Sequence, residues 1–456
     1  MTFRSPAFGA CAIAALVLAA CADAPTATTR QPIVSADVQA AAGSYAVTLE
    51  SVREVVPRSL LTSYVQVPGN PAVKVWKTGF GSAIAPGPTA GSFFLLTDRG
   101  PNIDYPAGTP DGKLFPAPRY APRIGLFTPS GANALRLVQS IDLALPSGKT
   151  LTGLPLPPGS CGFTNEKGYV LERGSLFVVS DPNAIDSEGL AVGLNGDFWI
   201  ADEYGPFIAR FDPAGRQVAR FGPCAGPGVT AGLPAVLATR RANRGMEGIT
   251  ITPSGLVVGM MQSPLDNPRA AGRASRALRI VVFDPTQPSA AATKQYVYLA
   301  ETPALLSSEI VAIDDTHFLV LERDGNLPGV PGTIKRIYKI DLAGATDESD
   351  PANGTTGKSY GVFGATLEAV TDYAGAGIVP VSKEVVVDLM TDLVGYPHDK
   401  PEGIALIGAD RIVISNDDDF GVVGDVTTGL LLRKALLNGV TDYNSVWTVR
   451  VSPPLR

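Results

Sequence analysis

A strand–turn–strand unit with an acidic residue at its start recurs through this 456-residue sequence, and this repeat limits the possible folds more than any other feature. The clearest copy is the stretch 186–216, DSEGLAVGLNGDFWIADEYGPFIARFDPAGR. An apolar run, an Asn-Gly turn and a second apolar run form the pattern of a β-hairpin. Because the first residue of one antiparallel strand lies beside the last residue of the next, we expect Glu188, Asp202 and Glu203 to share one end of the sheet.

The same unit recurs with Glu247, Glu309 and Glu402 as its opening acid. The separations from opening acid to polar end are 14 residues for Glu188 to Asp202, 15 for Glu247 to Gln262, 13 for Glu309 to Glu322 and 14 for Glu402 to Asn416. A weaker, earlier copy has Gly-Ser in place of the acid and ends at Asp98. Each copy is therefore expected to place polar side chains at the same end of its sheet.

The spacing of the repeats predicts an all-β fold of the β-propeller type. The opening acids lie 59, 62 and 93 residues apart, which is typical of a closed radial array of small sheets. We predict six blades, within a range of five to seven, with the ring closed by pairing of the strands expected at 45–55 and 445–451. A β-sandwich is less suitable, because it would not put the same acid at the same place in four repeats. The 49 glycines and 39 prolines suit the many turns required.

The N-terminus has the features of an export signal. Residues 1–20 hold one charged side chain and an apolar run too short to span a bilayer, which predicts a secretory signal. The run ends in Leu-Ala-Ala-Cys, which resembles a bacterial lipobox and predicts lipidation of Cys21 as the first mature residue. The alternative is an ordinary signal peptide cut after Ala22 or Ala24. Both predict export, to the periplasm or cell envelope, and the first adds a lipid anchor as the one membrane attachment.

After the signal we predict a flexible tether over residues 21–42, rich in Ala, Thr and Pro, and one β domain over 43–456. The chain is acidic, with a formal net charge of −6 and no basic tract, which argues against nucleic-acid binding. Oligomeric state is not indicated. The proline-rich stretch 100–123 lacks periodicity, which predicts a long irregular segment. Because this segment lies beside a repeat end, we expect it to have a functional role.

Two cysteines lie outside the leader, Cys161 and Cys224. In an oxidising compartment they could form one disulfide across a 63-residue separation. Two buried free thiols are the alternative that the sequence leaves open. Neither cysteine has a neighbour at the spacing of a zinc site.

The chemistry available at the repeat ends is that of oxygen ligands. With only two histidines, His317 in a turn and His398 near a repeat end, a site with several imidazoles is excluded, and no GxSxG motif indicates a serine hydrolase. Carboxylates and amides together favour Ca²⁺ over Mg²⁺ or Mn²⁺. The predicted metal ligands are Glu188, Glu203, Glu247, Glu309, Glu322, Glu402, Asn416 and Asp417. The predicted catalytic residues are Glu188, Glu247, Asp98, Asp202 and Glu203.

Cationic side chains accompany these acids. The predicted substrate-binding residues are Arg99, Arg244, Arg323 and Lys400. A ring of metal-binding carboxylates interleaved with cations suits a small anionic ester, because the metal polarises the ester while arginine holds the anion. The alternative is that these acids and bases only form ion pairs that lock one sheet to the next. Four carboxylates converging at one channel mouth favour a shared cation.

Several segments resemble the phytase-like family, a group of exported bacterial β-propellers described as esterase-like. They are TDRGPN (97–102), DSEGLAV (186–192), DFWIADEYGPFIARFDPAGR (197–216), LPAVLATRRANRGMEGITITPSG (233–255), LERDGN (321–326) and KPEGIAL (400–406). The resemblance implies a phytase-like propeller over 43–456, a divalent metal, calcium first, and hydrolysis of phosphoric or other esters. The chain departs from its own repeats at Met261-Gln262, where an acidic end is expected.

Two other functions fit the same residues. In a lactonase of the gluconolactonase type, an acid or amide before Gly opens each inner strand and binds one calcium, and three Glu-Gly pairs of this chain, beginning at Glu188, Glu247 and Glu402, fit that position. A surface-anchored propeller that binds a ligand or partner without chemistry is the third possibility.

Overall fold

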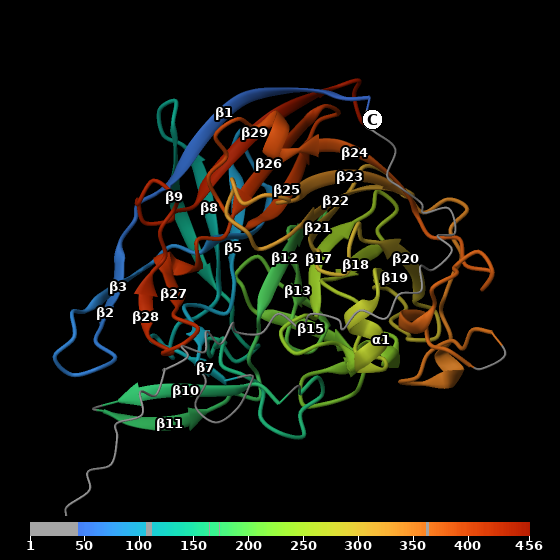
Figure 1. Ribbon diagram of the computed structural model, residues 1–456, viewed down its shortest axis with the longest axis horizontal. Coiled ribbons are helices and arrows are strands. Elements are labelled where there is room, and N and C mark those ends of the chain that lie inside the picture. Colours follow the sequence, from blue (N-terminus) through green and yellow to red (C-terminus); the bar gives the residue numbers. More distant parts are fainter. Residues whose placement is uncertain (1–43, 106–111, 164, 173, 362–363) are drawn as a thin grey trace, which may run out of the picture. The chain divides into compact units, whose positions relative to one another are not determined.

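The structure is a computed structural model that describes residues 44–456 apart from 106–111, 164, 173 and 362–363 (Figure 1). All described residues belong to one compact unit, residues 38–456. The predicted signal, the predicted tether and the lipidation site Cys21 all lie outside the described residues. Within the described part, no helix is long and apolar enough to cross a membrane.

The fold is all-β, as predicted, and its body consists of five antiparallel units of four strands each. The first unit is β4 (Phe80–Pro86), β5 (Phe93–Thr97), β8 (Arg123–Pro129) and β9 (Ala134–Asp142). The second is β12 (Ser187–Val192), β13 (Phe198–Asp202), β14 (Phe207–Phe211) and β15 (Gln217–Gly222), extended by β16 (Thr230–Ala231). The third is β17 (Met246–Ile251), β18 (Val257–Met261), β19 (Ala277–Phe283) and β20 (Lys294–Leu299).

The fourth unit is β21 (Leu306–Ala312), β22 (His317–Arg323), β23 (Lys335–Asp341) and β24 (Ser382–Asp388). The fifth is β25 (Pro401–Ile407), β26 (Arg411–Asn416), β29 (Ser445–Ser452) and β1 (Ala46–Val56). The two ends of the described chain therefore meet in one sheet, because β1 pairs antiparallel with β29 from Ala46↔Ser452 to Glu54↔Ser445. This is the pairing predicted for 45–55 and 445–451. A short parallel pairing of β1 with β9 joins the fifth unit to the first.

The first strands of the five units contact one another in a closed cycle. β4 packs beside β12, β12 beside β17, β17 beside β21, β21 beside β25, and β25 beside β4. Figure 1 shows β12, β17, β21 and β25 close together near the middle of the described part. Glycine is required where these strands approach most closely, because a Cβ on Gly189 would lie 2.5 Å from the backbone O of Glu247 and one on Gly248 would lie 2.6 Å from Ile310 N. The Glu-Gly pairs at Glu188 and Glu247 therefore lie where the first strands of neighbouring units are in close backbone contact.

The core is divided into clusters that lie between adjacent units. One cluster joins the third and fourth units through the buried side chains of Met260, Tyr298, Ile310 and Phe318. Alternate residues of each strand supply these side chains, as expected for sheets that are covered on their faces. Complete burial of each such side chain contributes about 1.5–3 kcal/mol, so the packing of sheet against sheet supplies most of the favourable free energy of folding.

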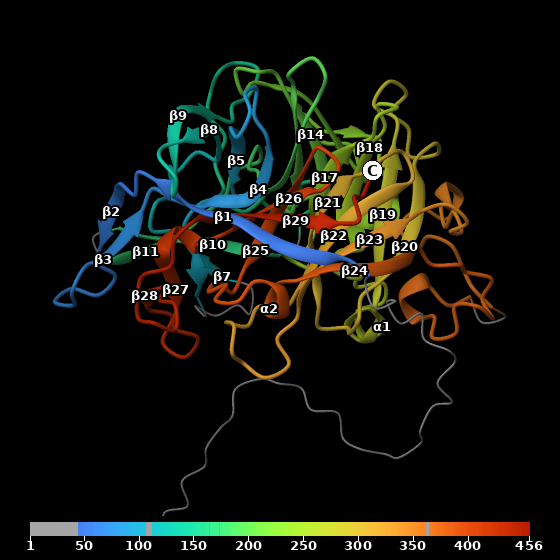
Figure 2. The same ribbon diagram turned by 90° about the horizontal axis from the view of Figure 1, so that it is seen from above.

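Shorter elements lie outside the five units. They are β2 (Leu60–Tyr64) with β3 (Val73–Trp76), a sheet of β6 (Ile103–Asp104), β7 (Gly112–Leu114), β10 (Lys167–Glu172) and β11 (Ser175–Val179), and the hairpin of β27 (Val422–Gly424) with β28 (Leu431–Arg433). Figures 1 and 2 both show them gathered on one side of the described part. The prediction of an irregular 100–123 segment was therefore wrong in part, since β6, β7 and the start of β8 fall within it.

The helices are short. They are η1 (Ala235–Thr239), α1 (Arg269–Ala274), η2 (Pro351–Asn353), η3 (Leu367–Ala369), α2 (Leu389–Asp392) and η4 (Asp419–Gly421).

Candidate functional site

A polar cavity of about 490 Å³ lies where the first strands of the five units begin. Nine acidic side chains line it, namely Asp98, Asp104, Glu188, Glu203, Glu247, Asp399, Glu402, Asp417 and Asp419. Six basic side chains line it as well, namely Arg99, Lys113, Arg244, Arg323, Lys400 and Lys434. The four cations predicted to bind substrate are all among them. The cavity is thus a dense mixture of charges with an excess of negative groups.

In three of the five units, a β-bulge in the first strand turns one side chain into this cavity. The register of β12 shifts between Ser187 and Gly189, which places Glu188 at the bulge, and the same shift occurs around Glu247 and Glu402. A bulge leaves one residue unpaired and redirects its side chain. The three predicted Glu-Gly acids therefore reach the cavity for the same local reason.

The second strand of each unit supplies the next set of lining residues. The residue paired across the bulge is Asp202, Met261, Glu322 or Asn416. The residue after it lines the cavity in every case, namely Glu203, Gln262, Arg323 and Asp417, with Asp98 in the first unit. The departure noted at Met261-Gln262 is thereby explained, because Gln262 occupies the place of Glu203 and Asp417 while Met261 is buried.

Glu309 is not in the cavity, which corrects its prediction as a metal ligand. In β21 the register shifts between Ser307 and Glu309, so Ser308 occupies the bulge and Glu309 stands one residue later, where the other units have Gly. A slip of one residue moves a side chain to the opposite face of a strand. Glu309 is 1% exposed, and its Oε1 accepts hydrogen bonds of 3.0 Å from the backbone N–H groups of Ile249 and Ile310.

Glu322 and Asn416, also predicted as ligands, have structural roles. Glu322 is completely buried, forms an ion pair with Lys383 at 3.1 Å and accepts hydrogen bonds from Glu301 N and the Tyr298 hydroxyl. Asn416 Oδ1 accepts from Ser445 N at 2.8 Å. Both side chains lie one residue before the cavity-lining position, on the other side of the strand.

Asp202, predicted to be catalytic, is likewise turned away from the cavity. It forms a buried ion pair with Arg220, and its Oδ1 accepts from the backbone N–H groups of Asp186 (3.1 Å) and Tyr204 (2.9 Å). These bonds hold the two segments that carry Asp186 and Glu203. Asp202 therefore acts on the site only through its neighbours.

The strongest candidate for a cation site is an acidic cluster of Asp186, Glu188 and Glu203. One carboxylate oxygen of each lies within 4.8 Å of those of the others. Asp186 Oδ2, Glu203 Oε1 and Glu247 Oε2 are buried and accept no hydrogen bond from any described residue. Because buried acceptors are normally satisfied, these orphaned oxygens fit a hard divalent cation that would supply their missing partner.

Asp186 was not among the predicted ligands, although the sequence contained a signal for it. It precedes Glu188 by two residues, and residues two apart in an extended segment share a face. Asp186 Oδ1 also accepts from Arg99 N at 3.3 Å, and its other oxygen lies 3.4 Å from the Arg99 guanidinium.

Burial and like charges raise the pKa of Glu188, Glu203 and Glu247. For Glu188 the main cause is burial, followed by the charges of Asp186 and Glu247, and its pKa lies well above the usual range. The pKa of Glu203 is raised in the same way, by burial and then by Glu247 and Asp186. Burial, followed by the charge of Glu402, raises the pKa of Glu247 to about 8. Without a cation, these carboxyl groups therefore hold protons that a metal would displace.

In metal-free protein we expect stability to fall as the pH rises from 4.5, the ordinary pKa of this carboxyl, to about 8. Over this window the folded state retains a proton on Glu247 that the unfolded state has released, so deprotonation opposes folding. Ca²⁺ binds the deprotonated group, and its affinity should rise through the same window. Urea unfolding in chelator and calcium titration, each below, within and above the window, measure both trends. A metal-free stability that rises with pH across it would contradict this assignment.

The basic residues predicted to bind substrate differ in whether they already form ion pairs with carboxylates. Arg99 is 5% exposed and pairs with Glu166 at 2.8 Å, while Arg323 pairs with Glu402. Lys400 lies 2.6 Å from Asp419 and 3.6 Å from Asp417. These three hold acids in place and have little capacity left for a substrate.

Arg244 differs from the other cations. Its Nη1 donates to Gln262 Oε1 at 2.8 Å, and within the described part of the chain it has no carboxylate at ion-pair distance. It lies beside the acidic cluster, since the charges of Glu203 and Glu247 act on it. Arg244 is therefore the lining cation best placed to bind an incoming anion.

A further set of charged residues was missed by sequence reasoning. Lys434 Nζ lies 2.8 Å from Asp399, 2.7 Å from Asp419 and 3.1 Å from Asp442. Lys434 follows β28, outside the repeated unit, and no spacing in the sequence relates it to the acids that it binds.

His398 belongs to a buried Ser–His–Asp arrangement behind the cavity. Its Nδ1 lies 2.8 Å from Asp442 Oδ1 and its Nε2 lies 2.8 Å from Ser445 Oγ. All three residues are at most 2% exposed and none lines the cavity, so a substrate does not reach the serine. This arrangement resembles a catalytic triad in distances but functions as a structural network. His317 follows the turn in which it was predicted to lie and begins β22, with its Nδ1 2.9 Å from Asp314 Oδ2.

Comparison with known proteins places this geometry in context. The profile of a family described as "Phytase-like: Esterase-like activity of phytase" matches residues 77–420, more than half of the chain. A relative from Arthroderma benhamiae, described as an uncharacterized secreted protein, is 26% identical over 369 residues, which cover 66% of this chain and 72% of the relative.

Two solved structures are more distantly similar. A luciferin-regenerating enzyme is 10% identical with a TM-score of 0.34, over 83% of this chain and 93% of that one. The PQQ-bound form of an aldose sugar dehydrogenase from Streptomyces coelicolor is 11% identical with a TM-score of 0.33, over 91% of this chain and 100% of that one. Scores this low identify neither the fold nor the function of the chain.

Proposed function

The chain belongs to the phytase-like family, and on this premise we propose that it is a Ca²⁺-dependent hydrolase of small anionic esters, with phosphoric esters as the first candidates. The observation that carries the proposal is the set of three buried oxygens on Asp186, Glu203 and Glu247 that accept no hydrogen bond from any described residue and lie near Arg244. The carboxylate oxygens can bind a metal ion, and the Arg244 guanidinium can bind the negatively charged group of a substrate. This combination suits an anionic ester.

Four acids would hold the ion, and other residues would prepare the site around it. Asp186, Glu188, Glu203 and Glu247 offer the oxygens, with Mg²⁺ or Mn²⁺ as less suitable occupants. When bound, the ion would polarise the ester and lower the pKa of water. Glu203 must first release its proton, and the charge of Arg244 favours this release.

The remaining lining residues restrict the substrate class. Most side chains around the cavity are charged, and the few apolar ones include Ile103, Leu306 and Val422. A hydrophilic ester loses little hydration energy on entering such a cavity, whereas a long apolar chain would find few partners. We therefore expect small, polar esters rather than lipids.

Arg244→Ala should raise the KM for a phosphate monoester by about tenfold or more and leave the KM for a neutral acetate ester nearly unchanged. The reason is that only the anionic substrate uses the guanidinium. Steady-state kinetics on both substrates measure the difference. Arg216→Ala is the matched control, because it removes the same charge from an exposed residue that does not line the cavity. Equal changes on both substrates would show that Arg244 has a structural role.

Turnover of p-nitrophenyl phosphate, p-nitrophenyl acetate and a sugar lactone, each with and without chelator, tests the proposed activity directly. Chelator-sensitive hydrolysis of the phosphate or acetate ester supports the proposal. Hydrolysis of the lactone alone would favour a gluconolactonase-type enzyme, and calcium binding with no turnover would favour a ligand-binding module. Either of these two outcomes would contradict the proposal that the protein hydrolyses esters.

We also propose that the five units are the blades of a β-propeller, at the lower end of the predicted range. The closed cycle of contacts among β4, β12, β17, β21 and β25 supports this. An experimental structure with a sixth sheet in the cycle would contradict it.

We propose further that the protein is exported, which the secreted relative supports, and that Cys21 carries a lipid. Mass spectrometry of the mature N-terminus tests both proposals.

A further inference from the structure

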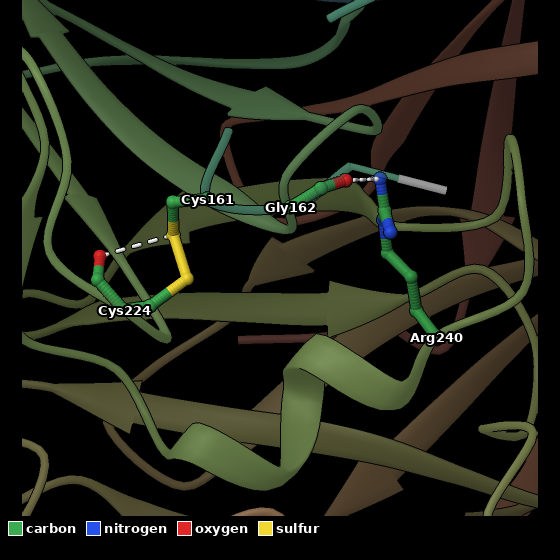
Figure 3. Close-up of a disulfide and its surroundings, with 4 residues drawn as sticks. All are labelled: Cys161, Gly162, Cys224 and Arg240. Carbon is green, nitrogen blue, oxygen red and sulfur yellow. Dashed lines mark hydrogen bonds between the residues drawn. A yellow bond between two sulfur atoms is a disulfide. The ribbon is translucent and has the colours of Figure 1, made fainter. Parts of the chain in front are cut away.

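The described part of the chain contains a disulfide. Cys161 and Cys224 are bonded across a sequence separation of 63 residues (Figure 3). The bond ties a turn, in which Phe163 N donates to Ser160 O, to the segment that follows β15. Neither segment contains a predicted catalytic, substrate-binding or metal-binding residue. The proposed function therefore does not explain why the disulfide is present.

Arg240 connects this turn to the site. Its Nη2 donates to the backbone O of Gly162 at 2.6 Å, as Figure 3 shows, and its Nε donates to the backbone O of Glu203 at 3.0 Å. Arg240 is 5% exposed and has no carboxylate at ion-pair distance in the described part of the chain. Burial lowers its pKa to about 10, so it remains a cation at neutral pH. Burying an arginine that binds only two carbonyl groups costs desolvation free energy. This cost suggests that the position of those two carbonyl groups is important.

The backbone of Glu203 is fixed on several sides. Its N–H donates to Asp186 O at 2.9 Å, and Arg240 binds its carbonyl. Gly162 packs against the next residues, because a Cβ on Gly162 would lie 2.4 Å from Gly205 Cα. On another side, a Cβ on Gly245 would lie 2.1 Å from Glu203 O. The Cys161 turn is thus one of the surfaces that determine where the Glu203 carboxylate stands.

We propose that the disulfide and Arg240 form a brace that positions Glu203, so that the cation affinity of the acidic cluster depends on the redox state of Cys161 and Cys224. The inference rests on the proposed cation site. Reduction by a dithiol cleaves the S–S bond, yields two cysteine thiols and leaves the reductant as its own disulfide. The Cys161 turn then loses its covalent attachment, the bond from Gly162 O to Arg240 loosens, and Glu203 gains freedom at the metal position. Groups that orient a ligand typically contribute about 10–100-fold to metal affinity.

Two measurements on the full mature chain test the brace. The first is the Ca²⁺ dissociation constant before and after reduction, with mass spectrometry to verify the two thiols. We expect reduction to weaken binding by about tenfold or more. Arg240→Met should weaken binding to a similar degree in oxidised protein, and reduction of this variant should then add little. Arg241→Met is the matched control, because this adjacent buried arginine binds Gly272 O and Asp266 instead. It should retain both the affinity and the redox effect of the wild type.

The second measurement is hydrogen exchange of the amides at 203–205 in metal-free protein, which requires no calcium binding. Reduction and Arg240→Met should each accelerate this exchange, while strands β17–β20 keep their protection. Unchanged exchange on verified reduction would overturn the inference, whether or not the protein binds calcium. Faster exchange with an unchanged Ca²⁺ dissociation constant would also overturn it. Failure of the oxidised wild type to bind calcium would instead refute the proposed function, and the exchange result would still decide the brace.

Discussion

Glu203→Gln is expected to weaken Ca²⁺ binding by about 100-fold, or about 2.7 kcal/mol, and at the same time to stabilise the metal-free protein. The two effects have opposite signs for one reason. Glu203 lies within 4.8 Å of Asp186 and Glu188, so its charge favours a bound cation and repels its neighbours when the cation is absent. Removing one of these buried like charges should stabilise the metal-free protein, because burial and the charges of Glu247 and Asp186 raise the pKa of Glu203 and make its ionised form unfavourable.

Calorimetric titration with Ca²⁺ and urea unfolding in chelator, both above pH 8, measure the two quantities. For the wild type, calcium at 100 times its dissociation constant should add about 2.7 kcal/mol to the free energy of unfolding, and the variant should lose this gain. A variant that binds calcium normally, and that is less stable than the wild type in chelator, would show that Glu203 is a hydrogen-bonded structural acid and that no cation site exists there.

Glu322→Gln should have the converse effect, a loss of about 3–5 kcal/mol of stability with no change in Ca²⁺ affinity. Glu322 resembles Glu203 in burial and in its place at the end of a second strand, but its charge is already used by Lys383 at 3.1 Å. The amide leaves that ammonium buried without a counterion. Burial already lowers the pKa of Lys383, so the deficit should shrink as the pH rises and the unpaired lysine loses its proton.

The double variant Glu322→Gln, Lys383→Met completes this test. Because replacing a buried ion pair with apolar groups is often neutral, the double variant should regain much of the stability that the single variant loses. Urea unfolding of the single and double variants, with calcium titration of each, gives the required values. A large drop in Ca²⁺ affinity in Glu322→Gln would restore Glu322 to the ligand set.

Much of the site was accessible from the repeat pattern. Alternating apolar runs and Asn-Gly turns identified the hairpins, and the antiparallel register that they imply correctly brought Glu188 and Glu203 to one end of a sheet. The same reasoning placed Glu247, Glu402, Asp417 and all four predicted cations around the cavity. The pairing of the chain ends also followed from the pattern alone.

The site residues that were predicted at the wrong position share one cause. Glu309 was counted as a repeat acid although its separation from Glu322 is 13 residues, whereas Ser308, 14 residues before Glu322, occupies the bulge. Similarly, Asp202 and Glu322 precede the lining position by one residue. The side-chain period of a strand is two residues, so an error of one residue exchanges the cavity for the opposite face.

By itself, the sequence determined the strands, their turns and which ends of the hairpins carry oxygen ligands, because these follow from periodicity and turn chemistry within about 30 residues. Only the tertiary structure decided which acids remain available. Lys383 neutralises Glu322 from 61 residues away, Arg323 neutralises Glu402 from 79, and Arg240 reaches Glu203 from 37. Whether a buried carboxylate is paired or left for a cation depends on partners brought together by the packing of separate sheets, and no local pattern contains that information.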